Sequence, residues 1–194
     1  MIPARVMLID HTPAQSLILE QALLDQGLVV VCRLATAQGL IKNVEVHQPD
    51  IIIMLLESPD RDTLDNMTVL SQHNPKPVII FAADNDSQVI SQAVQAGANA
   101  YVVDDLNTKR IKPIIDAASA RFDEYQALKK ELKQTQDQLA DRKVIDKAKG
   151  LLMKTKGLDE EQAYHAMRKM AMDQSKPLAD IAKNILSVMA LLSP

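Results

Sequence analysis

Short apolar runs alternate with longer amphipathic segments along the first part of the chain. The runs predict five strands, at residues 5–9, 28–34, 50–56, 77–83 and 100–103. The segments between them predict helices, at residues 12–27, 36–47, 60–73 and 86–98. Because the strands are apolar on both faces, we expect a doubly wound, five-stranded parallel sheet with helices on both sides, which is an α/β fold.

The chain after residue 110 shows only helical patterns. Five residues recur there at steps of three and four, as in a heptad seam, and they are Tyr125, Leu128, Leu132, Thr135 and Leu139. A helix packed against its own domain is the alternative explanation. Few other apolar residues flank the seam, so we favour a parallel coiled coil over residues 121–140 that joins two copies of the chain.

Three shorter helical patterns follow, at residues 141–156, 158–175 and 176–192. Gly157 is suited to end the first of them, and Asp159 is suited to begin the second. We therefore predict an α/β domain over residues 1–120, a coiled-coil helix over 121–140 and a small all-α domain of three helices over 141–194.

Charge is distributed unevenly along the chain, although the net charge is only −3. Residues 1–120 hold 8 basic and 14 acidic side chains, whereas residues 121–194 hold 14 basic and 11 acidic ones. This asymmetry indicates a regulatory module joined to one that binds a polyanion. A single cysteine excludes an internal disulfide and a multi-cysteine zinc site. No secretion signal or bilayer-length apolar run is present, so we expect a cytoplasmic location.

Residues 5–120 resemble the receiver domain of two-component response regulators. In that family, acidic residues after the first strand hold Mg²⁺ and an aspartate at the end of the third strand accepts a phosphoryl group. A Thr or Ser after the fourth strand and a Lys after the fifth complete the site. The resemblance places these four functions, in that order, at Asp10, Leu55, Ala82 and Asp104.

Three of the four residues cannot perform the chemistry of the family. A leucine has no nucleophilic oxygen, an alanine cannot hydrogen-bond a phosphoryl group, and a carboxylate replaces the expected cation. We therefore expect a pseudoreceiver that serves as a docking surface, without catalytic residues, metal or cofactor. A cation held by Asp10, Glu57 and Asp104 is the alternative, since oxygen ligands suit Mg²⁺.

The last part of the chain resembles the ANTAR domain, which is named after the AmiR and NasR transcription antitermination regulators. The resemblance covers most of residues 135–188. It depends on an ordered set of residues, namely Ile145, Ala148-Lys149-Gly150, Leu152-Met153, Gly157, Glu161, Ala163-Tyr164, Met167-Arg168, Ala171, Leu178 and Ile181-Ala182. A receiver, a coiled coil and this module, in this order, are most similar to nitrate-assimilation antiterminators of the NasT kind.

The resemblance and the charge pattern together indicate an RNA-binding surface on the three-helix domain. We expect RNA contacts from Lys143, Lys147, Ala148, Lys149, Gly150, Met153, Lys154, Tyr164, Arg168 and Lys169. Basic side chains would bind phosphates, the small residues would let an RNA loop approach the helix, and the tyrosine would stack on an unpaired base. The alternatives are a solvated basic face, close helix packing at Ala148 and Gly150, and a half-buried packing tyrosine.

The resemblance implies a regulator, not an enzyme, that holds stem-loops of a leader transcript and prevents a terminator from forming. Because the phosphoacceptor is missing, a ligand-sensing partner protein would control it, and in the nitrate family such a partner senses nitrate or nitrite. The alternatives are a DNA-binding response regulator and a pure protein-interaction module. The segment at residues 158–175 offers only Arg168 and Lys169 as base readers and lacks the glycine turn of a helix-turn-helix, which disfavours DNA.

Overall fold

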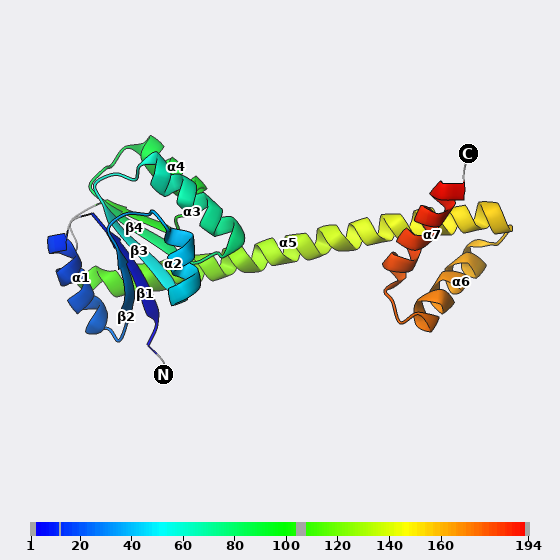
Figure 1. Cartoon of the computed structure of the whole chain (residues 1–194), viewed down its shortest axis with the longest axis horizontal. Coiled ribbons are helices and arrows are strands. Elements are labelled where there is room, and N and C mark those ends of the chain that lie inside the picture. The colour runs from blue at the N-terminus through cyan, green and yellow to red at the C-terminus, as the bar shows by residue number, and fades with distance from the viewer. Residues whose placement is uncertain (1–2, 12, 104–107, 193–194) are drawn as a thin grey trace. The chain divides into compact units, whose positions relative to one another are not determined.

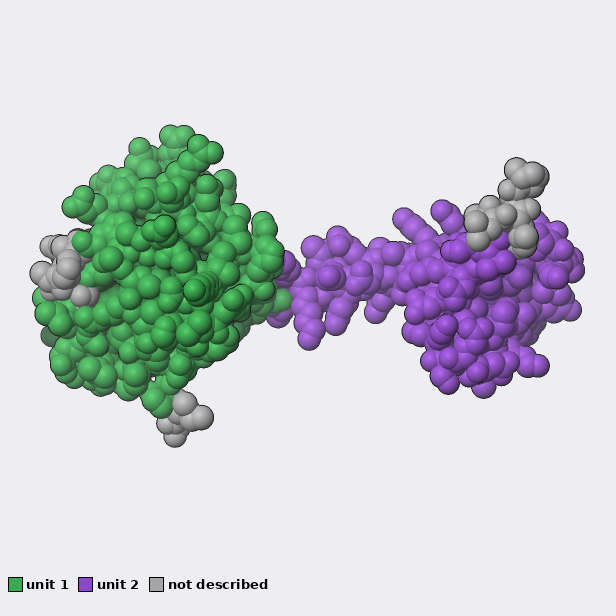
Figure 2. Space-filling model, in the orientation of Figure 1, with its two compact units in different colours: residues 1–126 green, residues 127–194 purple. Residues whose placement is uncertain are grey.

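The computed structural model describes residues 3–11, 13–103 and 108–192, with the backbone alone for 13–16 and 189–192. Two compact units divide the chain after Gln126, and Figure 2 shows residues 1–126 in green and residues 127–194 in purple. Within the described residues, no helix combines the length and the apolar character needed to cross a membrane.

Five parallel strands form the sheet of the first unit, in the order β2-β1-β3-β4-β5 (Figure 1). The strands are β1 (Arg5–Asp10), β2 (Val29–Leu34), β3 (Ile51–Leu56), β4 (Val78–Ala82) and β5 (Ala100–Val103). Every residue of β3 and β4 is buried, as expected for central strands covered on both faces. The predicted doubly wound, five-stranded parallel sheet is confirmed.

Helices cover both faces of this sheet (Figure 1). One core lies against α1 (Pro13–Leu24) and the first turns of α5 (Thr108–Lys156), and the other lies against α2 (Leu40–His47), α3 (Arg61–His73) and α4 (Ser87–Gln95). Successive side chains of a strand point to opposite faces. Accordingly, Leu55 of β3 belongs to the α1/α5 core, whereas its neighbour Leu56 belongs to the other core.

Local backbone chemistry decides where the helices begin. The helix predicted over residues 36–47 is shorter than expected, because Gly39 takes a left-handed conformation with φ 74° and α2 begins only at Leu40. The Asp60 carboxylate accepts a hydrogen bond from the Thr63 amide at 2.8 Å, so α3 begins one residue later than predicted. Hydrogen bonds from the Thr63 side chain, and then from its amide, lower the pKa of Asp60.

A single helix of 49 residues, α5, contains the last helix of the receiver-like fold, the predicted coiled-coil segment and the first helix of the C-terminal unit. No glycine or proline lies between residues 114 and 149, so nothing in the sequence interrupts the helical hydrogen bonds there. Gly157, with φ 65°, follows its last residue, as predicted for a helix stop.

The C-terminal unit packs α6 (Glu160–Asp173) and α7 (Leu178–Leu192) around the last turns of α5. A capping box begins α6, since Asp159 accepts from the Gln162 amide at 2.7 Å and the Gln162 side chain accepts from the Asp159 amide at 3.2 Å. Ala148, Met167 and Ala182 are fully buried and form a hydrophobic cluster in its core. The partly buried residues packed against them are Val144, Ile145, Leu152, Leu178, Ile185 and Leu186.

Candidate nucleic-acid interface

Buried apolar side chains occupy two of the positions at the edge of the sheet where a receiver would hold its phosphoryl group. Asp10 is the register partner of Leu55, and Ala82 is the register partner of Leu56. Leu55 is only 3% exposed and packs in the core against α1 and α5. Ala82 is buried in the opposite core. Asp104 lies outside the described residues, so the alternative cation site that includes it stays untested.

Hydrogen bonds between protein groups connect the strands at this edge. The Ser58 hydroxyl donates to Asp84 Oδ2 at 2.7 Å, and the Asp86 amide donates to Asp84 Oδ1 at 2.9 Å. The Tyr101 hydroxyl on β5 donates to the Asp84 carbonyl oxygen at 3.0 Å. The Asp86 amide and then the Ser58 hydroxyl lower the pKa of Asp84, while burial raises the pKa of Tyr101. The sequence pattern gave no indication of the part played by Tyr101.

The C-terminal unit exposes a set of cations on α5 and α6. These residues are Lys143, Lys147, Lys154, Arg168 and Lys169. Throughout the described ranges, none of the five forms an ion pair within 4.0 Å. The three lysines follow a helical spacing of four and seven residues, which aligns them along one face of α5. We call these three lysines the basic stripe.

Lys149 differs from the lysines of the basic stripe. Its side chain is 19% exposed, and its ammonium lies 2.7 Å from Glu160 Oε1 and 3.2 Å from Asp146 Oδ1. These hydrogen bonds, the one to Glu160 first, raise the pKa of Lys149. We predicted that the Lys149 ammonium would contact RNA, but in the structure it joins α5 to the start of α6.

The two small residues flanking Lys149 have different surroundings. Ala148 is fully buried between helices, so its predicted contact with RNA is wrong and close packing is the correct explanation. Gly150 lies on the opposite side, between the lysines of the basic stripe at 147 and 154, and a methyl group added there would meet nothing within 4 Å. Met153 is half-buried. A ligand can thus approach the helix backbone at Gly150 but not at Ala148.

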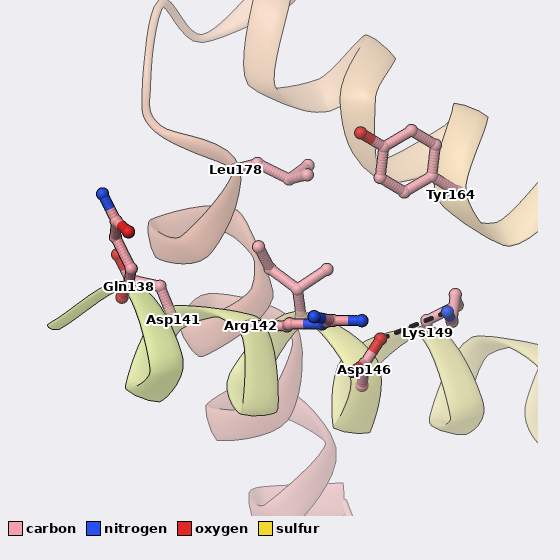
Figure 3. Close-up of a pocket in the computed structure, with 8 residues that line it drawn as sticks. Gln138, Asp141, Arg142, Asp146, Lys149, Tyr164 and Leu178 are labelled. Atoms are coloured by element: carbon pink, nitrogen blue, oxygen red, sulfur yellow. Dashed lines mark hydrogen bonds and ion pairs between the residues drawn. The ribbon is translucent and has the colours of Figure 1, made fainter. Parts of the chain in front are cut away.

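A shallow hollow of about 390 Å³ lies where α5, α6 and the first turn of α7 meet (Figure 3). Its lining comprises Gln138, Asp141, Arg142, Ile145, Asp146, Lys149, Tyr164 and Leu178. Tyr164 is 41% exposed, which is more than a packing tyrosine requires. We did not predict Arg142 as a site residue, although its spacing of four residues from Gln138 and three from Ile145 could have indicated a shared helix face.

The predicted dimer seam is uncovered in the single chain. Tyr125, Leu128, Leu132 and Leu139 are each between 55% and 61% exposed. The alternative explanation, in which this part of the helix packs against its own domain, is therefore wrong for these four side chains. An exposed apolar row at heptad spacing is what a coiled-coil partner would cover.

Two protein families match the chain. The response regulator receiver domain matches residues 6–116, more than half of the chain, and the ANTAR domain matches residues 133–186. The first match agrees with the sheet topology, and the second contains the basic stripe and the hollow. The chain belongs to the ANTAR-domain response regulators, which are regulators and not enzymes.

Relatives share this organisation to different extents. The transcriptional regulatory protein PdtaR of Mycobacterium tuberculosis is 28% identical over 188 residues, which cover 97% of this chain and 92% of PdtaR. A nitrate regulatory protein of Klebsiella oxytoca is 41% identical over 80 residues, or 41% of this chain and 20% of that protein. An aliphatic amidase regulator of Pseudomonas aeruginosa is 27% identical over 119 residues, covering 61% of each chain.

Solved structures support the fold of the first unit. The signal receiver domain of the response regulator NarL from Mycobacterium tuberculosis superposes with a TM-score of 0.54 at 21% identity, covering 61% of this chain and 98% of that domain. A signal receiver domain of a Luxo repressor protein from Vibrio parahaemolyticus gives a TM-score of 0.55 at 22% identity, covering 65% and 97%. At these identities the likeness shows the receiver fold alone.

Proposed function

We propose that the protein is an RNA-binding transcription antiterminator that acts as a dimer. Each C-terminal unit holds one stem-loop of a leader transcript, and the held stem-loops cannot rearrange into a terminator. A ligand-sensing partner protein controls this activity in place of phosphorylation. Because such transcripts are made in the cytoplasm, the protein acts there.

One observation carries the proposal, namely that the ANTAR domain presents exposed cations without internal partners in the described structure. Lys143, Lys147 and Lys154 line one face of α5, and Arg168 and Lys169 extend from α6. Cations of this kind bind phosphates and release counterions, which gives affinity that falls steeply with salt. The open backbone at Gly150, in the middle of the basic stripe, allows a loop to approach closely.

The seam on α5 supports the dimeric form. Its leucines are exposed at heptad spacing, and a second copy of the same helix would bury them. A dimer carries two ANTAR domains, so once one hairpin is bound the second binding event becomes intramolecular. The protein then selects transcripts in which two hairpins stand at a matching separation.

The two apolar replacements at the sheet edge support control by a partner. Leu55 has no oxygen to phosphorylate, and the buried Ala82 offers no hydroxyl. The Ser58–Asp84–Tyr101 hydrogen bonds already connect the strand ends without a phosphoryl group. A signal must therefore reach the C-terminal unit by binding, and a protein that masks the seam or the basic stripe would supply it.

The test is a binding titration of the full-length protein with a two-hairpin leader RNA and with a DNA duplex of matched length and charge. We expect RNA binding at least tenfold tighter than DNA binding, with an affinity that falls steeply as salt is raised. A single-hairpin RNA should bind more weakly than the two-hairpin RNA. Equal weak binding to RNA and DNA, or no binding at low salt, would show that the basic helices serve another partner.

A further inference from the structure

The hollow at the junction of α5, α6 and α7 differs in chemistry from the basic stripe. Part of its lining is apolar and aromatic. Ile145 of α5 belongs to this part, and Figure 3 shows Leu178 of α7 across from the ring of Tyr164 from α6. A planar ligand that stacks on the tyrosine ring suits this part of the hollow. A phosphate would gain little from such a lining.

The charges around the hollow give a phosphate no net attraction. Two carboxylates, Asp141 and Asp146, belong to its lining and balance the two cations there, Arg142 and Lys149. Each carboxylate already forms an ion pair with a lysine, Asp141 with Lys183 at 3.6 Å and Asp146 with Lys149 at 3.2 Å. The hollow therefore offers carboxylate oxygens as hydrogen-bond acceptors. The ion pairs with these carboxylates hold Lys149 and Lys183 in place.

Arg142 is the cation of the hollow that remains available. It is exposed, and it makes no ion pair with any residue that the structure describes. Figure 3 places its side chain on the α5 side of the hollow. A guanidinium can stack on an aromatic ring or donate in a fork to acceptors on a base edge. The carboxylates supply acceptors and the guanidinium of Arg142 supplies donors. The edge of a nucleobase carries both kinds of group and can pair with both.

The hollow also lies close to the surface that we assign to phosphates. Arg142 and Lys143 are consecutive residues, so their side chains project about 100° apart around α5. The basic stripe and the hollow are thus neighbouring faces of one helix. An RNA loop whose phosphates follow the basic stripe can turn one base toward Tyr164.

We propose that this hollow is the subsite for one unpaired base of each hairpin loop, stacked on Tyr164 with Arg142 at its edge. The proposal rests on the RNA-binding function proposed above. It divides recognition into two parts. The basic stripe supplies affinity for any folded RNA, and the hollow selects loops that contain an unstacked base.

The test is a double-mutant cycle between protein and RNA, with full-length protein and a two-hairpin RNA. Each loop position is replaced in turn by an abasic nucleotide, and affinities are measured for the wild type, Tyr164→Ala and Lys147→Ala. We expect one loop position at which loss of the base weakens wild-type binding about five- to hundredfold. The same loss should have little effect on Tyr164→Ala but its full effect on Lys147→Ala.

The salt dependence distinguishes the two kinds of contact independently. Tyr164→Ala should leave the slope of log affinity against log salt unchanged, whereas Lys147→Ala should reduce it by about 1. Arg142→Gln repeats the cycle at the opposite wall, with circular dichroism of each variant to confirm that it is folded. Additive losses at every loop position, with wild-type RNA binding intact, would overturn the base subsite alone. Absence of wild-type RNA binding would overturn the proposed function together with it.

Discussion

Lys149 and Glu160 are joined by an ion pair of 2.7 Å that connects α5 to the first turn of α6. A lysine from the segment with the strongest ANTAR resemblance is therefore used to hold the two helices together. The same ammonium also contacts Asp146 at 3.2 Å, so it stands between two carboxylates at the rim of the hollow.

Replacing Lys149 should therefore act through stability, whereas replacing Lys147 should act through RNA. We expect Lys149→Met to lower the melting temperature of the C-terminal unit, because Glu160 and Asp146 lose their shared partner. Lys147→Met should leave the melting temperature unchanged and weaken RNA binding, with a salt slope smaller by about 1. Circular dichroism melts and RNA titrations measure both effects. Equal changes in stability for the two variants would contradict the distinction.

Gly150 should show opposite effects on stability and on binding. An alanine there meets nothing within 4 Å and favours the helix, so Gly150→Ala should raise the free energy of unfolding by about 0.5–1 kcal/mol. The added methyl group should nevertheless weaken RNA binding, because it stands where a loop would approach. Gly157→Ala is the control for stability, since φ 65° there makes alanine destabilising. Urea unfolding measures the stability of both variants, and RNA titration measures their affinity. An unchanged RNA affinity in Gly150→Ala would contradict the proposal that an RNA loop approaches the helix backbone at Gly150.

Leu132 should control the oligomeric state. Leu132→Lys places a charge in the middle of the exposed seam, so we expect a dimer to dissociate and cooperative binding to two hairpins to disappear. Gln134→Lys introduces the same side chain two residues away, outside the seam, and should leave both properties unchanged. Light scattering coupled to size exclusion gives the mass of each species. A Leu132→Lys variant that remains dimeric would show that the copies associate elsewhere.

Leu55→Asp should not recover phosphorylation. The side chain is 3% exposed in an apolar core, so an aspartate there should lower the free energy of unfolding by at least about 3 kcal/mol. Leu55→Met keeps volume and polarity and should cost less than about 1.5 kcal/mol. Intact mass after treatment with acetyl phosphate and Mg²⁺ should show no added phosphoryl group in either variant. A stoichiometric mass increase in Leu55→Asp would show that the rest of the receiver site is functional.

Ser58 should determine part of the acidity of Asp84. Ser58→Ala removes one of the two hydrogen bonds that lower the pKa of Asp84, so this pKa should rise toward its ordinary value. It should stay below that value because the Asp86 amide still donates. Carboxyl chemical shifts followed by NMR against pH measure both values.

The same hydrogen bonds predict how stability depends on pH. The folded-state pKa of Asp84 is lowered, so its contribution is present above the unfolded value of about 3.9 and is lost as the pH falls through the folded pKa. In Ser58→Ala the loss should be smaller and complete at a higher pH, because the folded pKa lies closer to the unfolded value. A pKa of Asp84 that is the same in the variant and the wild type would exclude Ser58 as a partner in solution.

The sequence was sufficient for the fold because each strand is a continuous apolar run, and only a sheet covered on both faces buries such runs. It was insufficient for the small residues of the ANTAR domain. Ala148 and Gly150 are two positions apart, and the same two explanations applied to both. Their different fates depend on which face of α5 meets α6 and α7, and this is decided by tertiary packing.

The site shows the same limitation for charged residues. Lys147 and Lys149 are chemically identical and both lie in the predicted surface, but only Lys149 reaches a carboxylate of another helix. Arg142 was overlooked because it precedes the segment of strongest resemblance. The hollow that it lines exists only after Leu178 and Tyr164 have been brought to the same side of α5.

The continuity of α5 fixes the distance between the proposed dimer seam and the basic stripe. Leu132 and Leu139 of the seam and the lysines of the basic stripe belong to one uninterrupted helix, so their axial separation is fixed at 1.5 Å per residue. Inserting one residue between them would turn the RNA surface by about 100° with respect to the seam, whereas inserting seven would nearly restore its phase. In the proposed dimer, the number of residues between Leu139 and Lys143 therefore sets the separation of the two hairpins that can be bound together.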